Sequence, residues 1–236
     1  MGHNISLFDG ACWYVIFLFS TTVHEASHAL AAFRLGDDTA YRGGQVTLDP
    51  IPHIKREPFG MVVVPLLSFY FGGWMIGWAS APYDPMWANR YPKRAGIMAM
   101  AGPLANFLLM IVAAMIIRGG IAGGWFEAPE QITAAHVVAS KAGEGFAVLA
   151  ATLISILFSL NLLLFVFNLI PFPPLDGSSF PLLFLSHEGA ARYWALLRAP
   201  GMNMFGLIIA WRLFGVVYPA VHLFFVNALY FPKPYH

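Results

Sequence analysis

Four long runs of apolar residues dominate the hydropathy pattern, and polar segments separate them. A helix needs roughly 20 consecutive apolar residues to cross the hydrocarbon core of a membrane. We therefore predict an all-α protein with four membrane spans, at about residues 11–33, 95–117, 146–170 and 204–230. Together with their connections they would form a single integral-membrane domain over residues 1–236.

A fifth apolar stretch, residues 59–81, is interrupted by Pro65, Gly72, Gly73 and Gly77. Proline and glycine favour turns, so this stretch could re-enter the membrane and return to the same side instead of crossing it. Both alternatives remain open from the pattern alone.

The polar connections give weaker signals. The Gly43-Gly44 pair followed by residues 45–50 predicts a short β-hairpin or edge strand. Residues 118–144 are more polar and predict an aqueous loop, whereas residues 180–199 predict an amphipathic helix at the membrane surface.

Composition supports a multi-pass membrane protein. The chain is 58% hydrophobic and only 11% charged, whereas an ordinary soluble domain is about 25% charged. The net charge is +1 and no basic run is present, so we expect no nucleic-acid partner. The single cysteine, Cys12, excludes a disulfide framework within the chain and a site built from several thiolates.

The first predicted span carries two histidines and a carboxylate near its C-terminal end, in the sequence His24-Glu25-Ala26-Ser27-His28. Histidines four residues apart project from one face of a helix. In this HExxH pattern both imidazoles can bind one Zn²⁺, while the intervening glutamate acts as a general base toward water. Ionisable groups are costly in a membrane and should face protein or trapped water. The alternative is that these residues only pack against another helix.

A catalytic zinc site needs a third protein ligand. Asp176 is the acidic residue attached directly to the end of a long apolar stretch, after the proline-rich sequence Pro171-Phe172-Pro173-Pro174-Leu175. Prolines end the helix there, and irregular backbone at membrane depth must be buried in protein or line a water-filled cavity. Asp176-Gly177 could instead be a surface turn, but the HExxH pattern favours a ligand.

Three motifs occur in order along the chain: HEASH, then Gly102-Pro103-Leu104-Ala105-Asn106, then the run from Asn168 to Gly177. They resemble the signatures of the site-2 protease family, intramembrane zinc metalloproteases of peptidase family M50, over about residues 20–180. The resemblance implies that His24, His28 and Asp176 bind one Zn²⁺ per chain and that Glu25 is the catalytic base.

The resemblance also implies regulated intramembrane proteolysis, with membrane proteins that carry a transmembrane segment as substrates. The chain has too few residues for an inserted PDZ module or an appended nucleotide-sensing domain, so we expect a minimal form of the family. The sequence identifies neither the substrate nor a regulatory partner.

Two asparagines have open roles. The resemblance suggests that Asn106 faces the active site and binds substrate backbone or a developing oxyanion. Gly102-x-x-x-Asn106 is equally a helix-packing pattern. Asn168 could orient the Asp176 segment or satisfy carbonyls at a helix end, and we favour the second.

The number of membrane crossings between the two ligand motifs constrains the topology. His24 and His28 lie toward the end of the first span, and Asp176 follows the fourth apolar stretch. If every stretch crossed, these residues would be separated by much of a core ~30 Å thick. We therefore expect residues 59–81 to re-enter.

The distribution of cations supports this topology. A re-entrant residue 59–81 segment would place most of the cations at one end of the protein: Arg34, Arg42, Lys55, Arg56, Arg90, Lys93, Arg94, Arg192 and Arg198. Arg118, Lys141 and Lys233 fall at the other end. By the positive-inside rule, the site should open toward the cytoplasm, and we expect a prokaryotic plasma membrane.

Three function classes remain. The leading hypothesis is an intramembrane zinc endopeptidase. A catalytically silent membrane binding or scaffold protein of the same fold is the alternative, although zinc binding alone would not require Glu25. A metal transporter is disfavoured, because its ligands should be spread along a path and not gathered in one set.

Overall fold

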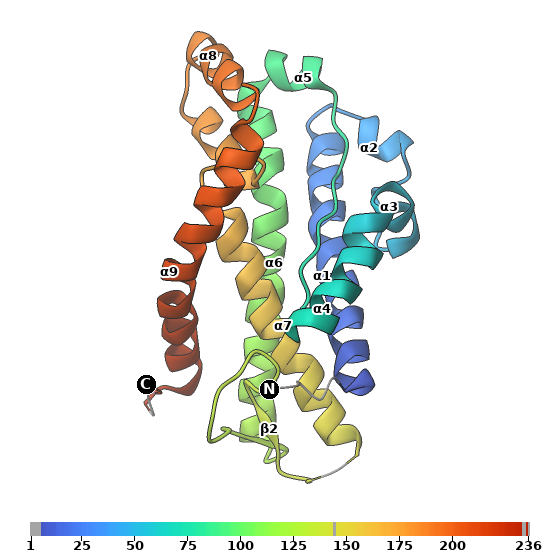
Figure 1. Cartoon of the computed structure of the whole chain (residues 1–236), viewed down its shortest axis with the longest axis vertical. Helices are drawn as coiled ribbons and strands as arrows, with labels where there is room; N and C mark the ends of the chain where they lie inside the picture. Colours follow the sequence, from blue (N-terminus) through green and yellow to red (C-terminus); the bar gives the residue numbers. More distant parts are fainter. Residues whose placement is uncertain (1–5, 144, 233–234, 236) are drawn as a thin grey trace.

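The computed structural model describes residues 6–143, 145–232 and 235. In this part of the chain four helices are long and apolar enough to cross a membrane: α1 (Leu7–Arg34), α6 (Pro92–Ala122), α7 (Phe146–Asn168) and α9 (Met202–Tyr230). They confirm the predicted all-α multi-span fold, and their bounds lie within a few residues of the predicted spans (Figure 1).

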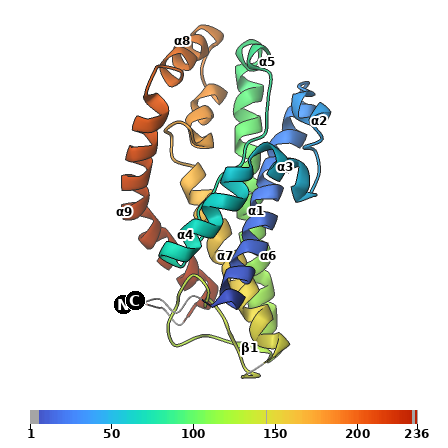
Figure 2. The same ribbon diagram turned by 45° about the vertical axis from the view of Figure 1, so that its right-hand side comes forward.

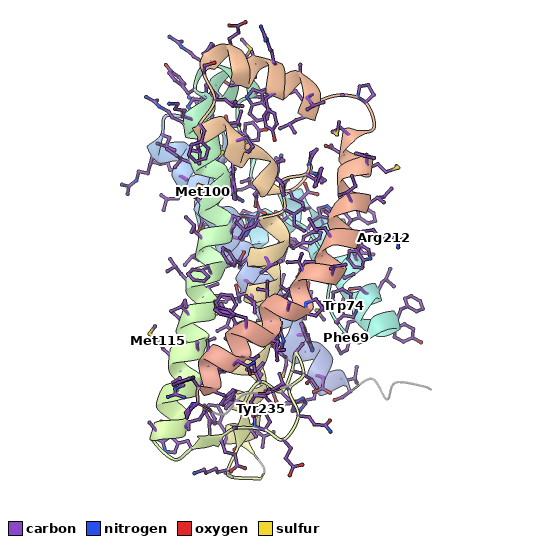
Figure 3. The ribbon with its side chains drawn as sticks, turned by 90° about the vertical axis from the view of Figure 1, so that its left-hand side faces the viewer. Phe69, Trp74, Met100, Met115, Arg212 and Tyr235 are labelled. Carbon is purple, nitrogen blue, oxygen red and sulfur yellow. The ribbon has the colours of Figure 1, made fainter. Side chains whose placement is uncertain are left out.

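Helix α6 is the centre of the bundle, because it packs against both α1 and α7. Helix α9 is the least buried of the four, and it stands beside α7 (Figures 1 and 2). Met115 on α6 and Arg212 on α9 both point away from the other helices in Figure 3. These outward faces would contact lipid, where the long arginine side chain can extend toward the membrane surface.

The fifth apolar stretch turns back against the side of the bundle, beside α1 (Figures 1 and 2). It forms a π-helix (Phe59–Val63) that continues into α4 (Val64–Gly72), and Gly73 then adopts a left-handed conformation with φ of 73°. An extended segment returns to α5 (Pro85–Arg90), at the same end of the molecule as α2 (Thr39–Arg42) and α3 (Pro50–Arg56) (Figure 1). This path favours the re-entrant alternative over a crossing.

The hairpin expected within residues 41–50 was wrong. Gly43 and Gly44 end α2, and the Asp49 side chain accepts a hydrogen bond from the Ile51 amide, which begins α3 with Pro50 in its first turn. A capped helix start therefore replaces the strand. The chain does contain a short antiparallel pair, β1 (Phe126–Glu127) with β2 (Ala139–Ser140), inside the predicted aqueous loop.

The two ends of the molecule differ in charge. A 3₁₀ helix, η2 (Asp176–Leu183), leads to α8 (His187–Leu197), which is the predicted amphipathic helix in shorter form. Helices α2, α3, α5 and α8 lie toward one end with most of the cations, which we call the basic end. Arg118 and Lys141 lie with β1 and β2 at the opposite end, and Lys233 is outside the described residues.

Candidate metal centre

His24 and His28 on α1 meet Asp176 at the start of η2. Asp176 Oδ2 lies 3.1 Å from His24 Nε2 and 3.3 Å from His28 Nε2, and the two Nε2 atoms are 3.0 Å apart. His24 and Asp176 are 152 positions apart in the chain. The fold therefore brings the two predicted ligand motifs together at one point.

Two glycines allow this approach. A methyl group at Gly102 would overlap the Nε2 atoms of both histidines, so α6 can lie against the imidazoles only because residue 102 has no side chain. A methyl group at Gly177 would overlap the main-chain oxygens of Leu169 and Ile170. The turn that presents Asp176 can therefore fold tightly onto the end of α7.

Helix α8 holds the Asp176 segment from the basic end. The Tyr193 hydroxyl donates a hydrogen bond of 2.7 Å to the main-chain oxygen of Ser178. Burial raises the pKa of Tyr193 above its ordinary value of 10.0, so the phenol stays protonated as a donor.

The hydrogen bonds behind the histidines fix which ring nitrogen faces Asp176. His24 Nδ1 donates to Asn106 Oδ1 at 2.5 Å, and His28 Nδ1 donates to the Met98 main-chain oxygen at 2.8 Å. Both Nε2 atoms are then left with a free electron pair, as metal-binding histidines require.

This donor set fits a zinc ion. Two Nε2 atoms and a carboxylate oxygen converge within 4.8 Å of one another, and such groups repel unless a metal cation or a proton lies between them. Zinc bonds of ~2.1 Å would place tetrahedral ligand atoms about 3.4 Å apart, close to the distances found. One carboxylate and two imidazoles also match the ligand types of catalytic zinc.

Glu25 lies beside this ligand set with a free carboxylate. It is 6% exposed, and no hydrogen bond or ion pair joins it to another residue in the described part of the chain. A buried carboxylate without a partner is costly, so its position calls for a functional explanation.

Two cavities meet at Glu25 and Asp176. One, of about 330 Å³, is also lined by His28 and extends to Trp194 and Arg198 on α8, at the basic end. The other, of about 360 Å³, is lined by His24 and extends between the helices to Phe167 and Asn168. The centre can thus be reached both from the basic end and from within the bundle.

The extended segment after α4 forms a wall of both cavities, through residues 79–80. Its position is fixed by contacts to the region around α3: the Trp78 amide donates to the Gly60 main-chain oxygen at 3.1 Å, and Ser80 Oγ donates to Glu57 Oε1 at 2.6 Å. The re-entrant segment therefore shapes the access to the centre.

The structure places the two predicted asparagines differently. Asn106 is fully buried behind His24, and its amide nitrogen donates to the Ser20 main-chain oxygen and to Asn161 Oδ1. Asn168 lines the second cavity and donates to the Leu164 main-chain oxygen, one turn back in α7, at 3.1 Å; whether it caps the helix end or orients the Asp176 segment stays a prediction. A substrate-binding role for Asn106 stays a prediction.

Sequence reasoning missed Asn161 and the Met98 carbonyl. Asn161 had a signal, because it is a polar residue within a long apolar run and such residues need partners in a membrane. The Met98 carbonyl had none, because every residue has one.

Comparisons with known proteins identify a family and several relatives of this chain. Residues 13–193 match the family model of peptidase family M50. "Putative zinc metalloprotease YwhC" of Bacillus subtilis is 33% identical over 168 residues, which cover 69% of this chain and 64% of YwhC.

Two mycobacterial relatives carry the name "Putative zinc metalloprotease Rip2". The Mycobacterium tuberculosis protein is 30% identical over 164 residues and the Mycolicibacterium smegmatis protein 28% over 160 residues; each match covers 68% of this chain and 52% of the relative. The chain thus spans about half to two thirds of the length of these relatives. No solved structure matches it significantly. The match to the family model covers most of the chain, which therefore belongs to peptidase family M50.

Proposed function

We propose that this protein is an intramembrane zinc metalloendopeptidase that hydrolyses peptide bonds in or near transmembrane segments of other membrane proteins. One observation carries the proposal: within a bundle of helices that could span a membrane, His24, His28 and Asp176 converge beside the carboxylate of Glu25, which has no hydrogen-bond partner among the described residues. The names of the relatives support zinc as the metal.

The roles of the residues follow from their positions. When bound by His24, His28 and Asp176, zinc would supply a Lewis acid that polarises the scissile carbonyl and acidifies water. Glu25 would take the proton of the attacking water and deliver it to the leaving amine. No residue in the described part of the chain bonds its carboxylate, which leaves it available for both steps.

The two cavities suggest separate routes for the reactants. Water would enter from the basic end, past α8, and a substrate segment would reach the centre from between the helices. A membrane-spanning substrate helix hides its carbonyls in hydrogen bonds, so it must unwind before attack. We therefore expect helix-weakening residues near the cleaved bond.

We further propose a prokaryotic plasma membrane, with the basic end and the metal centre toward the cytoplasm. The positive-inside rule supports this orientation, because most cations of the connections lie at that end. Reporter tags at positions 84 and 130 test it. Position 84 should be cytoplasmic and position 130 external; an external position 84 would contradict the proposal.

Zinc content tests the metal centre directly. The detergent-purified parent should contain about one zinc per chain, and His28→Ala and Asp176→Ala should each lose it or bind it weakly, because each removes a ligand. Glu25→Gln is the matched control and should keep zinc. A folded parent without zinc would refute the catalytic proposal.

Proteolysis is measured with single-span reporter proteins whose membrane segment contains glycine and proline, co-expressed with the parent or with His28→Ala. We expect cleavage that depends on the intact zinc site. Zinc binding without cleavage of any reporter would favour the binding or scaffold alternative.

A further inference from the structure

Behind His24 lies a buried polar network built from three helices. Ser20 on α1, Asn106 on α6 and Asn161 on α7 are each 0% exposed. Asn161 Nδ2 donates to Ser20 Oγ at 2.9 Å, and Asn106 Nδ2 donates to Asn161 Oδ1 at 2.8 Å. The network is joined to the metal centre through the hydrogen bond from His24 to Asn106.

Main-chain carbonyls set the direction of every hydrogen bond in this network. Asn161 Nδ2 also faces the Leu157 main-chain oxygen at 2.8 Å, which can only accept, so the amide nitrogen must point there and Oδ1 must point toward Asn106. Asn106 Nδ2 likewise faces the Ser20 main-chain oxygen at 3.3 Å. Its Oδ1 is then the only acceptor left for His24 Nδ1.

The two histidines of the centre are therefore held in different ways. His28 donates to a main-chain oxygen, whose direction is fixed by α6 itself. His24 donates to a side-chain amide that could rotate by 180° and present a nitrogen instead. Asn161 blocks that rotation together with the Ser20 main-chain oxygen, because the rotated amide of Asn106 would turn its oxygen toward both acceptors; the contact to Asn161 is the shorter, at 2.8 Å against 3.3 Å.

We propose that Asn161 is a positioning residue for the metal centre. It holds the amide of Asn106 so that His24 keeps its proton on Nδ1 and turns the Nε2 electron pair toward Asp176. This inference rests on the proposed metal site. Partners behind a ligating histidine typically change metal affinity by about 10- to 100-fold when they are removed.

Cobalt binding tests the inference, because Zn²⁺ has a filled d shell and gives no visible band whereas Co²⁺ does. The detergent-purified full chain is titrated with Co²⁺ against a chelator, and affinity and absorption spectrum are recorded. Asn161→Thr is the main variant: its shorter side chain can still donate to the Leu157 oxygen one turn back but does not reach Asn106. Asn161→Leu removes all three hydrogen bonds of the Asn161 side chain, to Leu157, Asn106 and Ser20.

We expect Asn161→Thr to bind Co²⁺ about 10-fold more weakly, with a shifted spectrum, and Asn106→Leu to lose about 10- to 100-fold. The double variant Asn106→Leu/Asn161→Thr should match Asn106→Leu within about twofold, because Asn161 acts through Asn106. Ser155→Ala is the control: Ser155 is a fully buried α7 residue that bonds the amides of Val137 and Val138 away from the centre. It should lower stability and leave cobalt affinity unchanged.

The outcomes separate the inference from the proposed function. Unchanged cobalt affinity and spectrum in both Asn161 variants would overturn the inference while the metal site stands. Losses that multiply in the double variant would also overturn it, because the two asparagines would then act independently. Failure of the folded parent to bind either Co²⁺ or Zn²⁺ would refute the metal site itself.

Discussion

The end of the bundle that carries β1 and β2 and the region of the metal centre both bury polar side chains, but they use them differently. At the β1–β2 end, Ser155 Oγ accepts from the amides of Val137 and Val138, and the hydroxyls of Tyr230 and Tyr235 donate to the main-chain oxygens of Val137 and Pro129. Each side chain there satisfies a main-chain group of the loop before α7 (Tyr235 is labelled in Figure 3).

At the candidate metal centre, His24 and His28 each donate a hydrogen bond from Nδ1, but their Nε2 atoms and the Asp176 carboxylate converge on one point. Glu25 has no recorded partner among the described residues, and the electron pairs of His24 and His28 face the Asp176 carboxylate. Polar groups that satisfy main chain stabilise a fold, whereas convergent acceptors destabilise it unless a ligand binds. The comparison therefore assigns stability to one region and chemistry to the other, and each can be tested by substitution.

The largest effect should come from Glu25→Gln. The amide keeps the size of the side chain but cannot take a proton, so cleavage of a membrane reporter should fall by roughly 10²- to 10⁴-fold. Zinc content should stay at the parental value, and thermal stability should not fall, because a neutral amide is less costly to bury than a carboxylate. Cleavage at the parental rate would mean that Glu25 is not the base, and the assignment of chemistry to this region would fail.

Gly102→Ala should have the next largest effect, on zinc affinity. The added methyl group would overlap both Nε2 atoms and displace them. Zinc affinity should therefore fall by roughly 100-fold or more, which exceeds the loss expected when only a hydrogen-bond partner behind a ligating histidine is removed. Gly119→Ala on the same helix is the matched control, because a methyl group there meets nothing within 4 Å. It should leave zinc affinity unchanged and stabilise α6 slightly. Equal zinc affinity in both variants would contradict the close approach of α6 to the imidazoles of His24 and His28.

Ser155→Ala probes the other region. It leaves two buried amides without an acceptor, and we expect a loss of about 1–3 kcal/mol in the free energy of unfolding, measured on the zinc-free protein. Zinc affinity should not change. A weakened zinc site in this variant would show that the two regions are coupled and that the comparison is too simple.

The sequence predicted the spans, and it proposed His24, His28 and Asp176 as ligands, for physical reasons that act locally. Length and hydropathy define a membrane helix, and the spacing of His24 and His28 defines one face of it. Asp176 could be found because acidic residues are rare next to apolar runs. That residues 1–236 form a single domain stays a prediction.

What the sequence could not predict depends on how helices rotate against one another. Asn161 supports Asn106 only because α7 turns that face toward α6, and the acceptor for His28 is a main-chain oxygen that no residue type marks. The β-hairpin was expected at residues 41–50, but the helix cap at Asp49 outweighed the turn signal of the Gly43-Gly44 pair. The observed pair, β1 with β2, has strands of only two residues, and such strands depend on their surroundings more than on their own sequence.

The smallest effects should come from a matched pair of tyrosines. Tyr193→Phe and Tyr230→Phe each remove one hydroxyl that donates to a main-chain oxygen, of Ser178 and of Val137 respectively. Each should lower the free energy of unfolding by about 1 kcal/mol. Only Tyr193 holds the segment that presents Asp176, so only Tyr193→Phe should also weaken zinc binding. If Tyr230→Phe weakened zinc binding equally, a lost hydrogen bond anywhere in the fold would be enough to loosen the centre, and the division between the two regions would fail.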